Sequence, residues 1–213
     1  MMTSLARVPP GRAGRLWLRR RLAIAQRGVD LLQRKLRLLV RVHHRLVSEA
    51  ERTGQEWTAT CADADKWGLR ACLADGRRAL RPASPAEVTV RWAETMGLRY
   101  PAGATCTPPP DPPPVCSAAL DEARQAAEIA IQAAVRHAVA QEAEHRVARE
   151  ISVTRQRIRA LRDRWIPRLI AAIEHIDLAL DEAERSDAAR LLRAGSGRSG
   201  DRAGTEAPAR APP

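Results

Sequence analysis

The chain has 213 residues, of which 45% are apolar but only 3% aromatic, and its net charge is +11. Aromatic residues usually supply much of the buried area of a compact core, so this composition argues against an ordinary α/β enzyme domain and against a β-sandwich. A chain rich in Ala, Leu, Arg and Glu is typical of long helices. No run of about 18 consecutive apolar residues occurs, so we expect no transmembrane segment.

The positive charge is concentrated in the first quarter of the chain. Residues 1–52 carry 13 cations and 3 acids, whereas residues 53–117 and residues 118–193 are each neutral. Nucleic acid, anionic lipid or an acidic protein surface would attract such a basic segment. An arginine-rich start without acids also resembles a mitochondrial transit peptide, but the helical pattern that runs through it favours a folded segment.

Residues 1–14 contain several Pro and Gly residues and predict an irregular lead-in, after which residues 15–52 form the N-terminal helix. Its seam residues recur at alternating intervals of four and three: Leu18, Leu22, Ala25, Val29, Leu32, Leu36, Leu39, His43, Leu46 and Ala50. This heptad spacing predicts a coiled coil, with His43 as a polar, register-setting residue. A single helix roughly 50 Å long cannot bury its seam alone, so we expect a partner helix.

Residues 53–116 differ in character and predict a small central knob. They contain five Gly residues and the Pro-dense run TPPPDPPP at 107–114. In EVTVRW, Val88, Val90 and Trp92 alternate with other residues, which predicts a short, half-buried strand. We expect the segment from Gly68 to Leu73, together with Leu80, to supply the strand's hairpin partner.

All four cysteines lie in this central segment, at positions 61, 72, 106 and 116. None forms a C-x-x-C pair, and their spacings are too wide for a zinc knuckle or ribbon. Four reduced thiols are the simplest interpretation, while one or two disulfides, or a metal site, stay open.

Residues 117–193 predict a C-terminal helix that begins at Ser117, a suitable N-cap residue. Its first half is dense in Ala, and its second half carries bulkier seam residues: Ile151, Ile158, Leu161, Trp165, Leu169, Ala172, Ile176, Ala179 and Ala183. The step from Trp165 to Leu169 is four where three is expected, and Pro167 lies in the same turn, so we predict a local break. Residues 194–213 lack periodicity and predict a disordered tail.

No pattern predicts catalysis, a cofactor or a metal. The chain has no G-x-x-x-x-G-K-[ST] phosphate loop and no Ser/His/Asp or Cys/His arrangement. Glu142 and His145 have the i, i+3 spacing of di-iron bundles, but that site needs a second such pair. We interpret these two residues as part of a solvated helix face.

Several motifs resemble the D subunit of the V-type (A/V-type) ATP synthases over about residues 9–193. The most specific is TRQRIRALRDRWIPRLIAAIEHI at 154–176, with its IPRL core. A basic and leucine-rich pattern from Pro10 leads to Arg27-Gly28 and Leu31-Leu32, and MGLRYP at 96–101 matches a turn motif. The chain departs from the family after Leu32, where QRKLRLLV contains no acid, and at 187–189, where Asp-Ala-Ala replaces an aromatic pair.

The resemblance implies a mainly α fold, a long antiparallel two-helix coiled coil with a small central knob that contains a β-hairpin. It implies the central rotor axle of a V-type ATPase, which transmits torque and couples ATP synthesis or hydrolysis to proton or sodium transport. Such an axle has no catalytic residue or cofactor of its own. Its implied partners are the catalytic and non-catalytic head subunits, the other central-stalk subunits and, indirectly, the membrane rotor, on the cytoplasmic face of the membrane.

Two sets of candidate site residues follow. The coiled-coil seam comprises Leu18, Leu22, Val29, Leu32, Leu36, Leu39, Leu46, Ile158, Leu161, Trp165, Leu169 and Ile176. The arginines expected to contact the head are Arg15, Arg19, Arg20, Arg27, Arg34, Arg37 and Arg168. The principal alternative is a basic coiled coil that binds nucleic acid, but its basic face has no interleaved aromatics and it leaves the IPRL motif unexplained.

Overall fold

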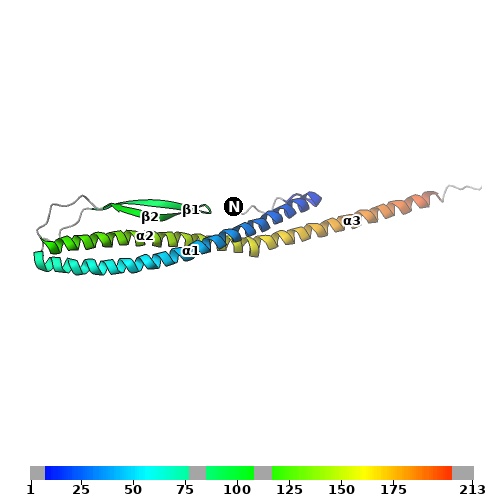
Figure 1. Ribbon diagram of the computed structural model, residues 1–213. Helices are drawn as coiled ribbons and strands as arrows, with labels where there is room; N and C mark the ends of the chain where they lie inside the picture. Colours follow the sequence, from blue (N-terminus) through cyan, green and yellow to red (C-terminus); the bar gives the residue numbers. More distant parts are fainter. Residues whose placement is uncertain (1–7, 77–84, 108–116, 203–213) are drawn as a thin grey trace, which may run out of the picture. The chain divides into compact units, whose positions relative to one another are not determined.

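The computed structural model describes residues 8–76, 85–107 and 117–202. The elements are α1 (Gly11–Asp75), β1 (Glu87–Thr95), β2 (Leu98–Thr107), α2 (Ala118–Arg159), the π-helical segment η3 (Ala160–Trp165) and α3 (Ile166–Arg202) (Figure 1). The long N-terminal and C-terminal helices pack together, which confirms the predicted mainly α fold with a small antiparallel sheet. Two compact units divide the chain: unit 1 takes residues 1–30 and 159–213, and unit 2 takes residues 31–158.

Helix α1 begins four residues before the predicted start and continues far beyond residue 52, so the predicted helix end is wrong. Gly54 and Gly68 each cost a helix only about 1 kcal/mol relative to Ala. The heptad intervals continue past them through Thr53, Trp57, Thr60, Ala64, Trp67 and Ala71. The helix ends only at Gly76, whose φ of 61° is the left-handed conformation typical of a helix C-terminus.

Strands β1 and β2 form an antiparallel hairpin in unit 2. The prediction of a strand over EVTVRW is confirmed, but its predicted partner is wrong. Residues 68–73 lie in α1, while Leu80 lies outside the described residues. The partner is β2, joined to β1 by Met96 and Gly97, which both have positive φ angles, as a two-residue turn of type I′ requires. The register shifts between Arg91 and Trp92 at a bulge.

Helix α2 begins directly after Ser117, as predicted, and the Ser117 carbonyl accepts hydrogen bonds from the amides of Leu120 and Asp121. The predicted break near Trp165 is present, because residues 160–165 are π-helical and Pro167 follows at once. The prediction of disorder from residue 194 is wrong over 194–202, which continue α3. Extending an existing helix adds one hydrogen bond per residue without a new nucleation cost. Residues 203–213 lie outside the described part.

The core of unit 1 lies between the start of α1 and the first half of α3. Leu18, Ala25 and Leu169 are buried at its centre. Half-buried side chains surround them: Val8, Trp17, Leu22, Trp165, Ile166, Ala172, Ile173 and Ile176. Arg12 contacts Glu184 whereas Arg19 contacts Asp177, so the residue numbers rise along one helix and fall along the other. The two helices therefore run antiparallel.

The core of unit 2 combines α1, α2 and the hairpin. Its buried residues are Leu39, Leu46, Tyr100, Ala143, Val147 and Ile151, and the hairpin residues Ala93 and Leu98 pack against them. The hairpin is thus anchored to the helices at its turn end. None of the described helices has the length and apolarity required to cross a membrane.

Candidate functional site

Every residue of the predicted seam is buried or half-buried. Leu18, Val29, Leu39, Leu46 and Leu169 are buried. The others are half-buried: Leu22, Leu32, Leu36, Ile158, Leu161, Trp165 and Ile176. One cluster in unit 1 brings together Leu18, Leu22, Trp165, Leu169 and Ile176. A second cluster, in unit 2, contains Leu36, Leu39 and Leu46, while the remaining four belong to neither cluster.

The seven arginines predicted to contact a head fall into two groups. Arg15 and Arg19 both pair with Asp177 of α3, with Nε–Oδ1 and Nη2–Oδ2 distances of 2.7 and 3.8 Å. Among the described residues, the other five are exposed and have no ion-pair partner: Arg20, Arg27, Arg34, Arg37 and Arg168. The first group therefore ties unit 1 together, and only the second is free to meet another molecule.

The seam of unit 2 contains polar pairs that the sequence did not predict. Lys35 Nζ lies 2.7 Å from Glu150 Oε1, and His43 Nε2 lies 2.8 Å from Glu144 Oε1. All four side chains are about one-fifth exposed. Partial burial strengthens such contacts relative to exposed pairs, because water screens them less. These pairs fix the register of α1 against α2, since a one-residue slip would separate each pair.

A close approach between α1 and α2 occurs around His137. Thr53 is buried and its hydroxyl donates to the carbonyl of Glu49 at 2.8 Å. The Trp57 ring stacks on His137 with 5.4 Å between centroids. A Cβ atom at Gly54 would lie 3.1 Å from His137 Cε1, so glycine leaves the room that the imidazole ring requires. The heptad intervals through Thr53 and Trp57 were the available signal for this contact.

The hairpin presents an exposed tryptophan close to the helices. The guanidinium of Arg146, on α2, lies 5.0 Å from the Trp92 ring centroid, and that of Arg99 lies 5.9 Å from it. Such cation–π contacts contribute about 0.5–1 kcal/mol at exposed sites. Arg146 therefore links Trp92 of β1 to α2.

Glu142 contacts two arginines on the same helix, Arg146 and Arg149. Arg146 Nε donates to its carboxylate at 2.6 Å, and Arg149 lies 3.5 Å away. The hydrogen bond from Arg146 lowers the pKa of Glu142 below its ordinary value. His145 lies 3.5 Å from Glu144 instead. Across the part of the chain that is described, no three His, Cys, Asp or Glu side chains are grouped to hold a metal ion.

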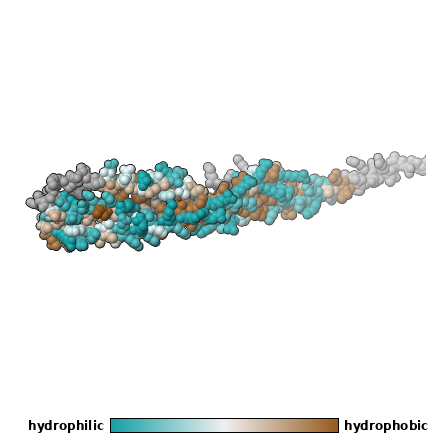
Figure 2. Space-filling model, in the orientation of Figure 1, coloured by the Kyte–Doolittle hydropathy of each residue, from teal (hydrophilic) through white to brown (hydrophobic). Residues whose placement is uncertain are grey.

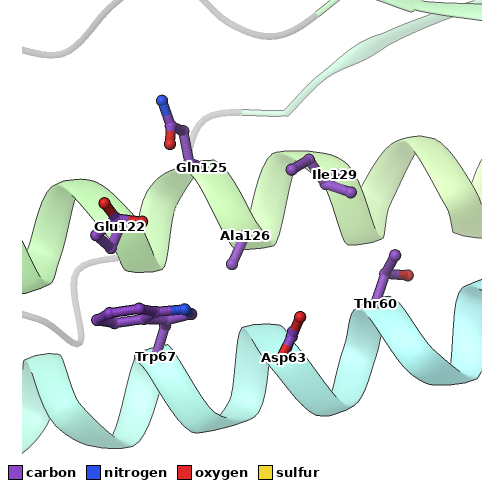
Figure 3. Close-up of a pocket in the computed structure, with 7 residues that line it drawn as sticks. All are labelled: Thr60, Asp63, Trp67, Glu122, Gln125, Ala126 and Ile129. Atoms are coloured by element: carbon purple, nitrogen blue, oxygen red, sulfur yellow. The ribbon is translucent and has the colours of Figure 1, made fainter.

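A shallow groove lies between α1 and α2 in unit 2 (Figure 3). It is lined by Thr60, Asp63 and Trp67 of α1 and by Glu122, Gln125, Ala126 and Ile129 of α2. Its volume of about 170 Å³ is below the roughly 300–1,000 Å³ of small-molecule sites. Cys61, Cys72 and Cys106 are free thiols, while Cys116 lies outside the described residues. This groove is therefore smaller than a typical small-molecule site.

Comparison with known proteins gives a consistent result. Residues 16–196 match the family model for the ATP synthase D subunit. The D subunit of the A-type ATP synthase of Thermococcus kodakarensis is 32% identical over 207 residues, which cover 90% of this chain and 95% of the relative. The D subunit of the V-type ATP synthase of Thermus thermophilus is 30% identical and covers 89% and 88% of the two chains. The D subunit of the V-type ATP synthase of Thermotoga neapolitana is 28% identical, over 87% of this chain and 96% of the relative.

Proposed function

Since this chain belongs to the family of ATP synthase D subunits, we propose that it is the central rotor axle of a V-type ATP synthase or ATPase. It transmits torque between the catalytic head and the membrane rotor. It thereby couples ATP synthesis or hydrolysis to the transport of protons or sodium ions. In this role it catalyses no reaction itself and works at the cytoplasmic face of the membrane.

The observation that carries the proposal is the pairing of α1 with an antiparallel helix in each unit. In unit 1 the partner is α3, joined through Leu18 and Leu169. In unit 2 the partner is α2, joined through Leu39 and Val147. A torque-transmitting element must resist twisting, and two helices whose side chains interlock along a seam resist it better than one helix.

Arginines without a partner in the described part supply contacts to the head in this proposal. Arg20, Arg27 and Arg168 are exposed in unit 1, and Arg34 and Arg37 are exposed in unit 2. An exposed ion pair contributes only about 0.2–1 kcal/mol. Contacts of that strength can break and form again at each step of rotation. The hairpin of unit 2 then faces the other central-stalk subunits.

A rotation experiment tests the proposal directly. The chain is produced together with the head and stalk subunits, and the complex is purified by a tag on a head subunit. A bead is attached to Thr89→Cys, on the exposed face of β1, in a variant whose four native cysteines are Ser. We expect one copy of the chain per complex and unidirectional bead rotation when ATP is added.

Two results would contradict the rotor assignment. One is a complex that hydrolyses ATP in step with ion transport while the bead stays still. The other is a chain that never purifies with the head and instead binds DNA tightly, with an affinity that falls steeply as salt rises. The second result would favour the nucleic-acid alternative.

A further inference from the structure

A regular stripe of side chains lies on the outer surface of α1 within unit 2. We define this outer stripe as Leu31, Arg34, Leu38, Arg41 and Arg45, which follow one another at intervals of three and four. All five are exposed, and the leucines are exposed by 63% and 39%. The same heptad interval separates the seam residues Leu32, Leu36 and Leu39, which are buried or half-buried, and the last two belong to the core of unit 2. The outer stripe is therefore a second face of the same helix, on the side away from the seam.

The three arginines of the outer stripe are unpaired within the described residues. Asp30 and Glu49 lie four residues from Arg34 and Arg45 on α1, but among the described residues neither carboxylate pairs with these arginines, and Arg41 has no acid within one turn. Arg52 shows the contrast, because it contacts both Glu49 and Glu56 on the same helix. The outer stripe thus presents three guanidinium groups and two leucine side chains that have no partner among the described residues.

The alternation of leucine and arginine matches one kind of partner best. Phosphates of a nucleic acid would engage the arginines but not leucines placed once every seven residues. A membrane surface selects a broad apolar face with aromatic residues at its edge, and the stripe is only one leucine wide. A facing helix brings side chains at the same heptad interval, so both residue types find a counterpart.

We propose that the outer stripe binds an acidic amphipathic helix of another subunit of the same complex. This inference depends on the proposed function, because it takes the partner from the assembled ATPase. Asp or Glu residues at heptad spacing pair with Arg34, Arg41 and Arg45, where the planar guanidinium can bind a carboxylate through two parallel hydrogen bonds. Apolar residues between those acids pack on Leu31 and Leu38. Figure 2 shows hydrophilic and hydrophobic residues intermixed on the face of the molecule in view.

Photocrosslinking in the assembled complex tests the inference. Leu38 is replaced by p-benzoylphenylalanine, the complex is purified by a tag on a head subunit, and crosslinked peptides are identified by mass spectrometry. We expect a crosslink to a helical segment of another subunit that carries Asp or Glu at intervals of three and four. A crosslink to lipid, to nucleic acid or to a segment without such acids would overturn the inference, as would the absence of any crosslink in an assembled complex.

Charge reversal provides the matched control. Arg34→Glu with Arg41→Glu should lower the crosslink yield about tenfold, because two attractions become repulsions. Arg155→Glu with Arg157→Glu makes the same change in net charge on the exposed side of α2 and should leave the yield unchanged. Equal losses in both double variants would contradict a specific stripe. Reversing the crosslinked acids of the partner to Arg should restore the yield.

The proposed function and the stripe fail in distinguishable ways. If the unaltered chain never joins the complex, the rotor assignment is wrong. If it joins and rotates but Leu38 yields no crosslink to an acidic helix, only the stripe assignment is wrong.

Discussion

Units 1 and 2 use the same heptad rule to build two different interfaces. Large side chains fill the seam of unit 1, where Leu18 and Leu169 are fully buried beside Trp165. In unit 2 small residues are buried at several seam positions, among them Ala71 and Ala133. Bulky seams remove more apolar area from water, whereas small residues let the helices approach closely. Heptad spacing therefore fixes which face is buried but not how the interface gains its stability.

The two units also differ in how polar groups are used. In unit 1 the ion pair of Arg12 with Glu184 lies at the surface, while that of Arg15 with Asp177 is partly buried. Unit 2 places Lys35 and Glu150 partly inside the interface, and its hairpin adds Tyr100 as a third source of buried area. We expect the stability of unit 1 to depend on a few buried leucines. We expect the stability of unit 2 to depend on close packing and on the register of α1 against α2.

Truncating a large side chain at the centre of unit 1 gives the largest expected effect. Leu169→Ala should lower the free energy of unfolding by about 2–5 kcal/mol, because it removes buried methyl groups and leaves a cavity. The measurement is urea unfolding followed by circular dichroism. Leu192→Ala, whose side chain is 76% exposed on α3, is the control and should change little. Equal effects of the two variants would mean that unit 1 does not depend on its leucine seam.

Enlarging a small seam residue tests the close approach in unit 2. Ala133 is buried between the helices, so Ala133→Leu should destabilise the chain by about 1–3 kcal/mol through overpacking. Ala138→Leu, at an exposed position on the same helix, is the matched control. If the larger side chain at residue 133 instead stabilised the protein, the helices of unit 2 would not be closely packed there.

Double-mutant cycles compare the ion pairs of the two units. The side chains of Lys35 and Glu150 are each 22% exposed, against 83% and 63% for Arg12 and Glu184. We expect a coupling energy of about 1 kcal/mol for the first pair and about 0.2 kcal/mol for the second. Unfolding of the single and double Ala variants gives both values. A stronger coupling for Arg12 with Glu184 would reverse the contrast between the units.

Much of the helical pairing was predictable because a seam is a local, periodic property. The alternation from Leu18 to Leu46 identified the buried face, and the four-residue step from Trp165 to Leu169 identified the irregular turn that the structure accommodates as η3. Such signals need no knowledge of distant residues. The same intervals continue beyond Ala50 through Thr53 and Trp57, so the signal for a longer α1 was present in the sequence but was outweighed by Gly54.

The errors arose where a long-range contact decides the local structure. Gly54 looks like a helix terminator, but it lies against His137 in the folded chain, and only the partner helix reveals why glycine is there. The turn at Met96-Gly97 lacks the Asn-Gly or Asp-Gly pair that usually predicts a type I′ turn. Similarly, nothing near Arg15 or Arg19 indicates that Asp177 pairs with both. The free arginines could therefore be separated from the paired ones only in the structure.

The smallest expected effect concerns pH and belongs to unit 2 alone. The hydrogen bond with Arg146 lowers the pKa of Glu142 in the folded chain. The contact therefore stabilises the fold fully at any pH above the pKa that Glu142 has in the unfolded chain. That effect is lost as pH falls through the lower, folded pKa. For an exposed pair four residues apart we expect about 0.3–0.5 kcal/mol. When unfolding is measured between about pH 7 and pH 3, the free energy of unfolding should fall less steeply with decreasing pH for Glu142→Gln than for the unaltered chain. Arg146→Gln should reproduce that flatter profile, because it removes the other half of the same contact. If Glu142→Gln left the profile unchanged while Arg146→Gln altered it, the contact of Arg146 with Trp92 would be the cause instead.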